Sequence, residues 1–263
     1  WGAAERAAAH AVIDGDRQTM GPRVAEFETE FAKLVQARHA VMVTSGSMAL
    51  LLAAFWYAEH IGRCKVVIPA VTWPTTAWSF IQAGCRVIFA DVDPETLLMK
   101  TNGDYDGFAH VPVHLMGNRC ARSYGGRVIE DSCEAIQPLS GTVSCYSMYF
   151  SHHLNTVEGG VVCTNDETIA DWLRSARAHG WARGRSDWLS CVERYPEIDR
   201  RFLFVTQGFN MKPTELAAAV GLVQLKKLPK TMEGRKHAYL YMAERLAGFA
   251  DRLQPMRLHG NDG

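Results

Sequence analysis

Two adjacent histidines, His152 and His153, lie in the segment FSHHLNTVEGG, shortly before a Glu-Gly-Gly turn. The residues before this segment alternate between polar and apolar types, and the run GVVCTN after it is apolar, so both flanks are typical of β-strands. An imidazole titrates near neutral pH and can therefore move protons in a reaction. A hydrogen-bonded core histidine is the ordinary alternative, and we interpret His153 as structural.

Two carboxylates, Asp131 and Glu134, follow another apolar run in the segment VIEDSCEA. Carboxylates just past a buried strand can ligate a metal, pair with a cation, or lie on a solvated loop. The segment by itself leaves these three interpretations open.

A Gly-Ser turn, Gly46 and Ser47 in TSGSMAL, opens an apolar helical stretch. Free N–H groups and the positive end of a helix dipole form a binding site for a phosphate, although a plain N-cap is the common alternative. Trp73, after PAVT, is either a stacking platform for a ring or a core residue.

Hydrophobic spacing predicts the elements that must position these residues. Helices are predicted over residues 22–37, 48–61, 75–84, 167–178, 213–228 and 230–248, with Ser47 as a cap, Pro213 in a first turn and Pro229 as a stop. Strands are predicted over residues 39–46, 65–70, 85–93, 110–115, 127–131, 145–151 and 160–165. Strands that alternate with helices indicate an α/β fold with a mostly parallel sheet covered on both faces. The residues with chemistry then gather at the carboxyl ends of the strands.

Composition excludes several classes of function. Lys plus Arg (28) balances Asp plus Glu (28), which argues against nucleic-acid or anionic-membrane binding. The longest apolar run, 48–58, is too short to span a bilayer, and the amino-terminal residues lack the layout of a signal peptide. The seven cysteines are odd in number and have no CxxC spacing, so we expect reduced cysteines in a cytoplasmic protein, with no disulfide framework and no metal site.

Seven motifs occur in one order along residues 20–245: TSGSMALLLA, IPAVTWPTTA, VDPETL, VPVHLMG, VIEDSCEA, SMYFSHHLNTVEGGVVCTND and GFNMKPTELAAAVGLVQLKKL. Together they resemble the sugar aminotransferase family of DegT/StrS type. That resemblance implies fold type I of the enzymes dependent on pyridoxal phosphate (PLP), with a mostly parallel sheet between layers of helices.

The resemblance also implies a role for each cofactor-binding residue. Gly46 and Ser47 would hold the cofactor phosphate through backbone amides, with the hydroxyl of Ser147 added. Trp73 would stack on the pyridine ring, and Asp131 would pair with the protonated ring nitrogen.

Three further roles follow from the same resemblance. Glu134 would reach the 3-hydroxyl edge of the ring, and Asn210 would reach the cofactor phosphate of a neighbouring subunit, so a homodimer is expected. His152 stands where most of the family has the lysine that binds PLP covalently. The cofactor would therefore be held noncovalently, as PLP or pyridoxamine phosphate (PMP), and His152 would keep only the proton-transfer role.

Histidine at this position is characteristic of the family's sugar 3-dehydratase branch. The resemblance implies dehydration at C3 of a nucleotide-linked 4-keto-6-deoxy sugar, with glutamate as amino donor. Two alternatives stay open: transamination of such a sugar, and an inactive remnant that retains the cofactor pocket.

The resemblance divides the chain into a large PLP-binding domain, residues 1–210, and a helical segment, residues 211–263, that leads to a largely absent C-terminal small domain. The connection over residues 118–126 is also shorter than the family's crossover helix.

Overall fold

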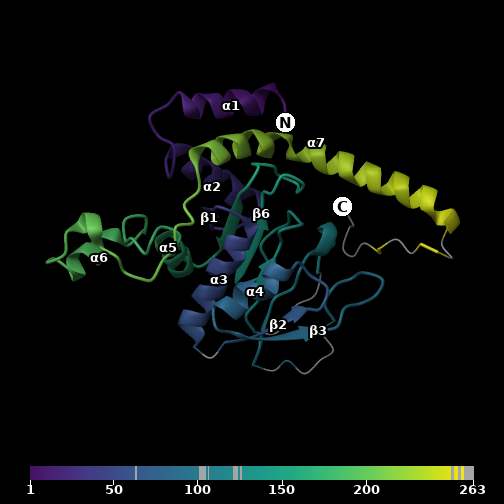
Figure 1. The fold of residues 1–263 in the computed structure, drawn as a ribbon, viewed down its shortest axis with the longest axis horizontal. Coiled ribbons are helices and arrows are strands. Elements are labelled where there is room, and N and C mark those ends of the chain that lie inside the picture. The colour runs from purple at the N-terminus through teal and green to yellow at the C-terminus, as the bar shows by residue number, and fades with distance from the viewer. Residues whose placement is uncertain are drawn as a thin grey trace.

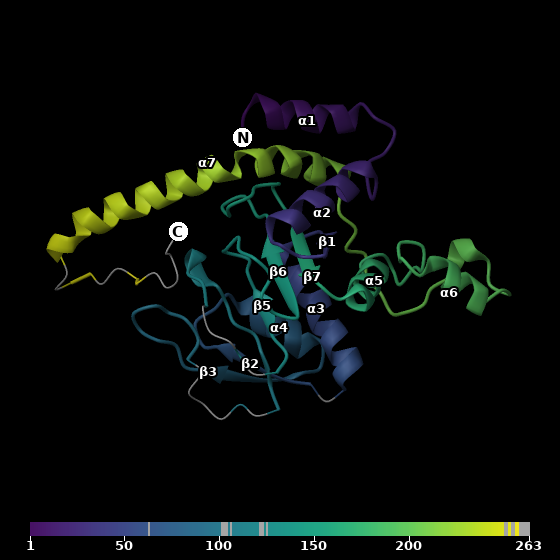
Figure 2. The ribbon, with the colours of Figure 1, turned by 180° about the vertical axis from the view of Figure 1, so that it is seen from behind.

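The computed structural model describes residues 1–62, 64–100, 105, 107–120, 124, 126–249, 252, 253, 256 and 257. A twisted sheet forms the centre, helices lie against it, and a long C-terminal helix extends away from the body (Figures 1 and 2). None of the helices in these residues combines the length and apolar character that a membrane span needs.

The described residues form seven strands. They are β1 (His39–Val43), β2 (Lys65–Pro69), β3 (Arg86–Ala90), β4 (Ala109–His110), β5 (Ile129–Asp131), β6 (Val143–Ser147) and β7 (Gly160–Thr164). One ladder has the order β1-β7-β6-β5 and the other β3-β2-β4. Parallel bridges, His110 to Val128 and Val113 to Asp131, join the two ladders. In these ladders the pairings of β7 with β1 and with β6 are antiparallel and the other three pairings are parallel, so the prediction of a mostly parallel sheet is confirmed.

Helices cover both faces of the sheet. Alternate strand residues face opposite sides, so Val41 and Val43 of β1 pack with α3 (Gly46–Ile61), α4 (Pro74–Gln82) and α5 (Glu167–Ala176). Ala40 and Met42 of the same strand pack with α2 (Pro22–Leu34) and α7 (Glu215–Leu246). Truncation of a buried aromatic such as Phe27 or Phe31 would cost about 3–5 kcal/mol.

Two carboxylates fasten the amino-terminal helices to α7. The Glu215 carboxylate accepts hydrogen bonds of 2.9 Å from the N–H groups of Gly21, Arg23 and Val24, and so caps α2 from another helix. In α1 (Ala3–Ile13), Glu5 is buried and lies 2.6 Å from Lys227 Nζ. The hydrogen bond from Lys227 lowers the pKa of Glu5 to about 2.

Several predicted boundaries were wrong. The two helices expected on either side of Pro229 are one continuous helix, α7, because packing against α1 and α2 offsets the hydrogen bond that a proline removes. Pro213 precedes the N-cap Thr214, and Ser45, rather than Ser47, caps α3. The segment after α5 contains α6 (Trp188–Arg194) and the 3₁₀ helix η2 (Arg200–Phe202).

The connection between β4 and β5 is compact. Its described residues contain one 3₁₀ helix, η1 (Leu115–Gly117), in place of an α-helix. Three backbone hydrogen bonds join this connection and β4 to β5: His110 N to Arg127 O, Asp131 N to Pro112 O, and His114 N to Asp131 O.

Another 3₁₀ turn, η3 (Ala247–Phe249), ends α7.

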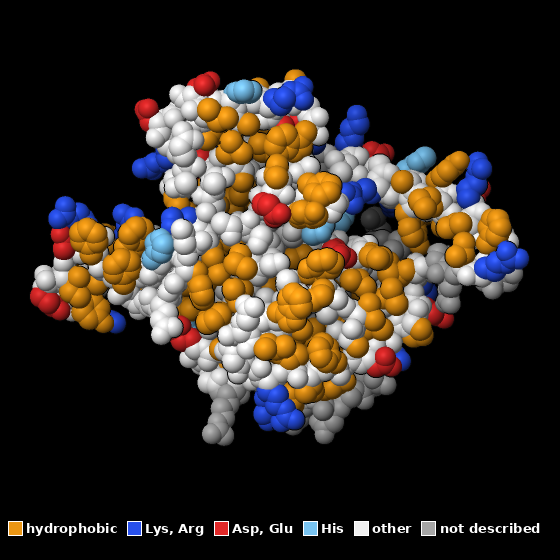
Figure 3. All heavy atoms as spheres, viewed as in Figure 1, with side chains coloured by type: hydrophobic (Ala, Val, Ile, Leu, Met, Phe, Trp, Pro, Cys, Tyr) orange, Lys and Arg blue, Asp and Glu red, His pale blue; other side chains and the backbone are white. Residues whose placement is uncertain are grey.

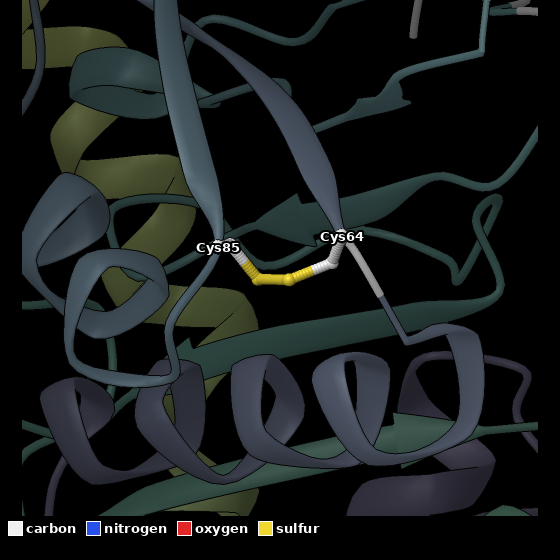
Figure 4. The surroundings of a disulfide bond; sticks show 2 residues. All are labelled: Cys64 and Cys85. Carbon is white, nitrogen blue, oxygen red and sulfur yellow. A yellow bond between two sulfur atoms is a disulfide. The ribbon is translucent and has the colours of Figure 1, made fainter.

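Cys64 and Cys85 form a disulfide, so the expectation of reduced cysteines was wrong for this pair (Figure 4). Each cysteine stands one residue before a strand, and Lys65 pairs with Arg86 in the parallel register of β2 and β3. That register brings the two Cα atoms to 4.8 Å, within the range of a disulfide. The spacing of the cysteines along the sequence could not predict this bond, because it is the register of β2 and β3 that brings Cys64 and Cys85 together.

Alkylation of the unfolded protein without reductant should label five cysteines, and prior reduction should raise the number to seven. Reduction should also lower the free energy of unfolding by about 3 kcal/mol, because it frees a loop of 21 residues. Intact-mass spectrometry and urea unfolding measure the two effects. A Cys191→Ser variant, which removes a free thiol, is the control, and seven labels without reductant would contradict the bond.

Candidate active site

A cavity of about 500 Å³ lies at the carboxyl ends of β1, β5 and β6. It brings together seven of the eight residues predicted for the site: Gly46, Ser47, Trp73, Asp131, Glu134, Ser147 and His152. Asn210 is not in its lining. The convergence agrees with the rule that ligands of α/β proteins bind at the carboxyl ends of the strands.

The amino end of α3 forms one wall. The Ser45 hydroxyl caps the helix by accepting from the N–H of Met48, and the N–H groups of Gly46 and Ser47 belong to the first turn, where a helix has no internal acceptors. A Cβ atom added to Gly46 would lie 2.6 Å from Ser147 Cβ, so only glycine allows the helix to approach β6 this closely. The N–H groups and the Ser147 hydroxyl therefore face one small space, which suits a phosphate.

Asp131 forms the floor of the cavity and is 3 % exposed. One carboxylate oxygen accepts a 2.7 Å hydrogen bond from the Thr76 hydroxyl, and the other accepts from the N–H of Cys133 at 3.1 Å. The Thr76 hydroxyl lies 2.9 Å from that of Thr72. These contacts fix the carboxylate in a position where it can hold a protonated ring nitrogen.

Glu134 and Trp73 lie at the rim. A carboxylate oxygen of Glu134 accepts a 2.6 Å hydrogen bond from the N–H of Met116, a residue with a φ of 53°. Trp73 is the N-cap residue of α4 and is 68 % exposed, so it is not a core residue. An exposed indole at the mouth of a cavity is available to stack on a flat ring.

His152 lies in the turn between β6 and β7 and is half-buried. Its ring is 5.7 Å from that of Tyr149, centroid to centroid, and its buried Nδ1 atom has no hydrogen-bond partner among the described residues. Burial lowers the pKa of His152, the Arg235 charge lowers it further, and the Glu134 and Asp131 charges oppose both effects. The imidazole is therefore neutral at pH 7 and able to accept a proton.

Asn210 lies elsewhere, bridged to Ala178 and exposed. Its side-chain oxygen accepts a hydrogen bond from Lys212, whose Nζ is also 2.7 Å from His179 Nε2. Lys212 and four arginines, Arg17, Arg174, Arg177 and Arg183, line a second cavity of about 500 Å³. The role of Asn210 toward a neighbouring subunit stays a prediction.

Thr76, which holds the Asp131 carboxylate, was not among the residues predicted for the site. The position of Thr76 at the start of the helix after β2 was a signal, because that helix begins at the same edge of the sheet. Ser45 was also missed as the cap of α3.

The donors in the cavity fit PLP or PMP. The space bordered by the N–H groups of Gly46 and Ser47 and by the Ser147 hydroxyl, called here the phosphate cradle, suits the cofactor phosphate. Trp73 offers a flat face to the ring, and the Asp131 carboxylate is fixed where it can pair with a protonated ring nitrogen. The unpartnered Nδ1 of His152 gives the site a group that can transfer protons.

The model of the DegT/DnrJ/EryC1/StrS aminotransferase family matches residues 2–262. A GDP-4-keto-6-deoxy-D-mannose 3-dehydratase from Escherichia coli O55:H7 is 34% identical over an alignment that covers 93% of this chain and 70% of that protein. The same kind of enzyme from Yersinia pseudotuberculosis is 33% identical and covers 90% of this chain and 67% of its own length. The E. coli 3-dehydratase structure with bound hydrated PLP superposes with a TM-score of 0.81 at 32% identity, covering 94% of this chain and 70% of that chain.

A Gly46→Ala substitution should abolish tight PLP binding and destabilise the fold by about 1–3 kcal/mol, because the added Cβ would overlap Ser147. PLP titration followed by absorbance, together with urea unfolding, measures both effects. Gly234→Ala is the matched control. Gly234 lies within α7, where a Cβ meets nothing within 4 Å, so stability should rise by up to about 1 kcal/mol. Parental PLP affinity in Gly46→Ala would disprove the proposed cradle.

Proposed function

The chain belongs to the DegT/DnrJ/EryC1/StrS aminotransferase family, as its motifs predicted, and from this premise we propose that it removes the C3 hydroxyl of a nucleotide-linked 4-keto-6-deoxy sugar with PLP or PMP as cofactor. The observation that carries the proposal is His152. It lies in the cavity, and the resemblance puts it where most of the family has a lysine; no lysine lines that cavity in the described part of the chain.

The proposal gives each side chain a defined task. The amino end of α3 and the Ser147 hydroxyl hold the phosphate, and Trp73 covers one face of the ring. Asp131, fixed by Thr76, keeps the ring nitrogen protonated. When bound, the cofactor supplies an electron sink for breaking bonds next to the substrate carbon that it holds.

His152 supplies proton transfer. Because its pKa is lowered, the imidazole is neutral at physiological pH and can remove a proton, and the imidazolium so formed can protonate the leaving C3 hydroxyl. A histidine lacks the primary amine with which a lysine anchors PLP covalently. We therefore favour dehydration over repeated transfer of amino groups.

The overall reaction balances with glutamate as the second substrate. The C3–O bond of the sugar is replaced by a C3–H bond, and glutamate is oxidised to 2-oxoglutarate with release of its nitrogen as ammonia. The similarity to enzymes named GDP-4-keto-6-deoxy-D-mannose 3-dehydratase supports this class of substrate.

The proposal includes a homodimer in which Asn210 serves the partner's cofactor. Two observations support it. Asn210 is exposed, outside the cavity of its own chain. Apolar side chains also gather over the region of α4, β2 and β3 (Figure 3), where the exposed fractions of Trp78, Ile81 and Phe89 are 55 %, 54 % and 59 %.

A His152→Asn variant should lose about two orders of magnitude in turnover, the scale expected when a general acid–base is removed. The assay supplies glutamate and a nucleotide-linked 4-keto-6-deoxy sugar, and follows 2-oxoglutarate, ammonia and the sugar lacking its C3 hydroxyl. Asparagine can still form hydrogen bonds but cannot transfer protons at pH 7.

One control accompanies this experiment, and two outcomes would contradict the proposal. PLP binding to His152→Asn, measured by absorbance, should match the parent, since His152 is not one of the proposed phosphate or ring ligands. A stable amino sugar without ammonia release would mean that transamination is the reaction. Parental turnover in the variant would remove His152 from the chemistry.

An Asn210→Ala variant should weaken PLP binding by about tenfold or more without changing the mass of the assembly, because one hydrogen bond to a charged phosphate contributes about 1.5–3 kcal/mol. Sedimentation should give twice the chain mass for parent and variant. Gln207→Ala, on the same exposed segment, is the matched control. A monomeric parent with full activity would overturn this arrangement.

A further inference from the structure

The turn that carries His152 has several internal hydrogen bonds, but none of them uses the carbonyl of Ser151 or of His152 as acceptor. The N–H of Thr156 donates to Met148 O at 3.1 Å, and the N–H of His152 donates to Tyr149 O at 2.9 Å. Val157 has a φ of 72°, in the left-handed region that a β-branched residue avoids. These internal bonds leave the carbonyls of Ser151 and His152 to a donor from outside the turn.

Arg235 of α7 is that donor. Its Nη2 atom donates to Ser151 O at 2.9 Å and to His152 O at 3.0 Å. The two carbonyls belong to consecutive peptide units on either side of the His152 Cα atom, so one guanidinium fixes both. An arginine suits this task because its donors lie in a rigid plane.

The same helix holds the turn at a second point. The Gln224 side-chain oxygen accepts from the N–H of Asn155 at 3.3 Å, and its Nε2 donates to the buried Glu5 at 2.8 Å. Gln224 and Arg235 are separated along α7 by about 16 Å at 1.5 Å per residue. Helix α7 thus contacts the turn at two points, through Gln224 and through Arg235. Both ribbon views agree, since α7 lies over β6 in each (Figures 1 and 2).

Charges from three directions act on His152. Asp131 at the end of β5 and Glu134 just after it face the imidazole with negative charge, whereas Arg235 reaches it from α7 with positive charge. Burial, with smaller contributions of the same sign from Arg235 and His152, lowers the pKa of His153 to about 4. Arg235 is the cation among these groups, and its charge acts in the same direction as burial, which is the largest cause of the lowered pKa of His152.

We propose that Arg235 is a positioning residue for His152: through its bonds to the Ser151 and His152 carbonyls, it sets the place of the imidazole in the cavity and adds a positive charge beside it. The inference about catalysis rests on the proposed function, whereas the inference about the turn does not. Loss of the two bonds would let the turn shift, and a displacement of about 1 Å can cost up to about 100-fold in rate.

The test compares three variants in the unliganded and the PLP-loaded protein. Arg235→Gln removes the charge, Arg235→Lys keeps it on a flexible stem, and Lys236→Gln removes an equal charge from the next, exposed position of α7. NMR titration of the protein labelled in histidine follows the His152 imidazole, with His152→Asn used to identify its signal. Turnover is then measured as a function of pH for each variant.

We expect Arg235→Gln to raise the pH at which His152 titrates, and to lower kcat about tenfold or more with KM changed less than twofold. The acid limb of the rate profile should move to higher pH, because protonation of the base then begins at a higher pH. Arg235→Lys should titrate like the parent but recover only part of kcat, and Lys236→Gln should match the parent in both. A purely structural role for Arg235 would not move the titration.

An unchanged His152 titration together with parental kcat in Arg235→Gln would overturn the inference. If Arg235→Gln fails to fold, as judged by circular dichroism, the Arg235→Lys variant is the test. Parental kcat in Arg235→Lys would overturn the claim that Arg235 positions the imidazole. Reduced kcat with a parental His152 titration would support that claim. If the parent itself turns over no keto sugar, the proposed function fails. The titration in the unliganded protein then still decides the role of Arg235.

Discussion

The site depends on the close approach of the amino end of α3 to the ends of β6 and β7. A Cβ on Gly160 would lie 2.2 Å from Ser45 O, and a Cβ on Gly46 would overlap Ser147. Glycine at both positions removes the side chains that would separate the helix from the strands. The positive end of the helix, a hydroxyl from β6 and the histidine turn that follows β6 therefore border one small space. None of these groups could act together if the helix stood even a methyl group further away.

Strand β5 carries a carboxylate on each face. Asp131 points into the cavity, whereas Glu130 is buried behind it and accepts from the N–H groups of Ser140 and Gly141 and from the Ser140 and Ser144 hydroxyls. Burial raises the pKa of Glu130, but the His114 imidazole, with its Nε2 atom 3.5 Å away, and the hydrogen bonds from Ser140 and Ser144 outweigh it and bring that pKa to about 2. One carboxylate thus fixes the strand while its neighbour remains available to a ligand. The alternation of a β-strand separates the two tasks.

Local patterns predicted most of the site because parallel strands end at a common edge. Apolar runs located β1, β5 and β6, although the predicted strands ran past the observed ends of β1 at Val43 and of β6 at Ser147, and residues at these ends met in the cavity as expected. What the patterns missed depends on contacts between segments distant in sequence. Pro229 predicted a helix stop, but packing against α1 kept α7 continuous. The Cys64–Cys85 bond depends on the register of β2 and β3, and the hydrogen bonds from Arg235 to the turn that carries His152 depend on how α7 crosses that turn. The spacing of residues along the sequence predicts neither contact.

The pairing of β1 with β7 has a consequence for the order of folding. Residues 39–43 pair with residues 160–164, so the lip of the cavity exists only after a very long segment of chain has closed on itself. Contacts of such separation form late, because their entropy cost must be met before they contribute. An early intermediate could build α3 and even the β2–β3 pair, yet it would lack a surface that recognises a phosphate. The cofactor can then stabilise the finished protein by mass action but cannot guide the chain toward it.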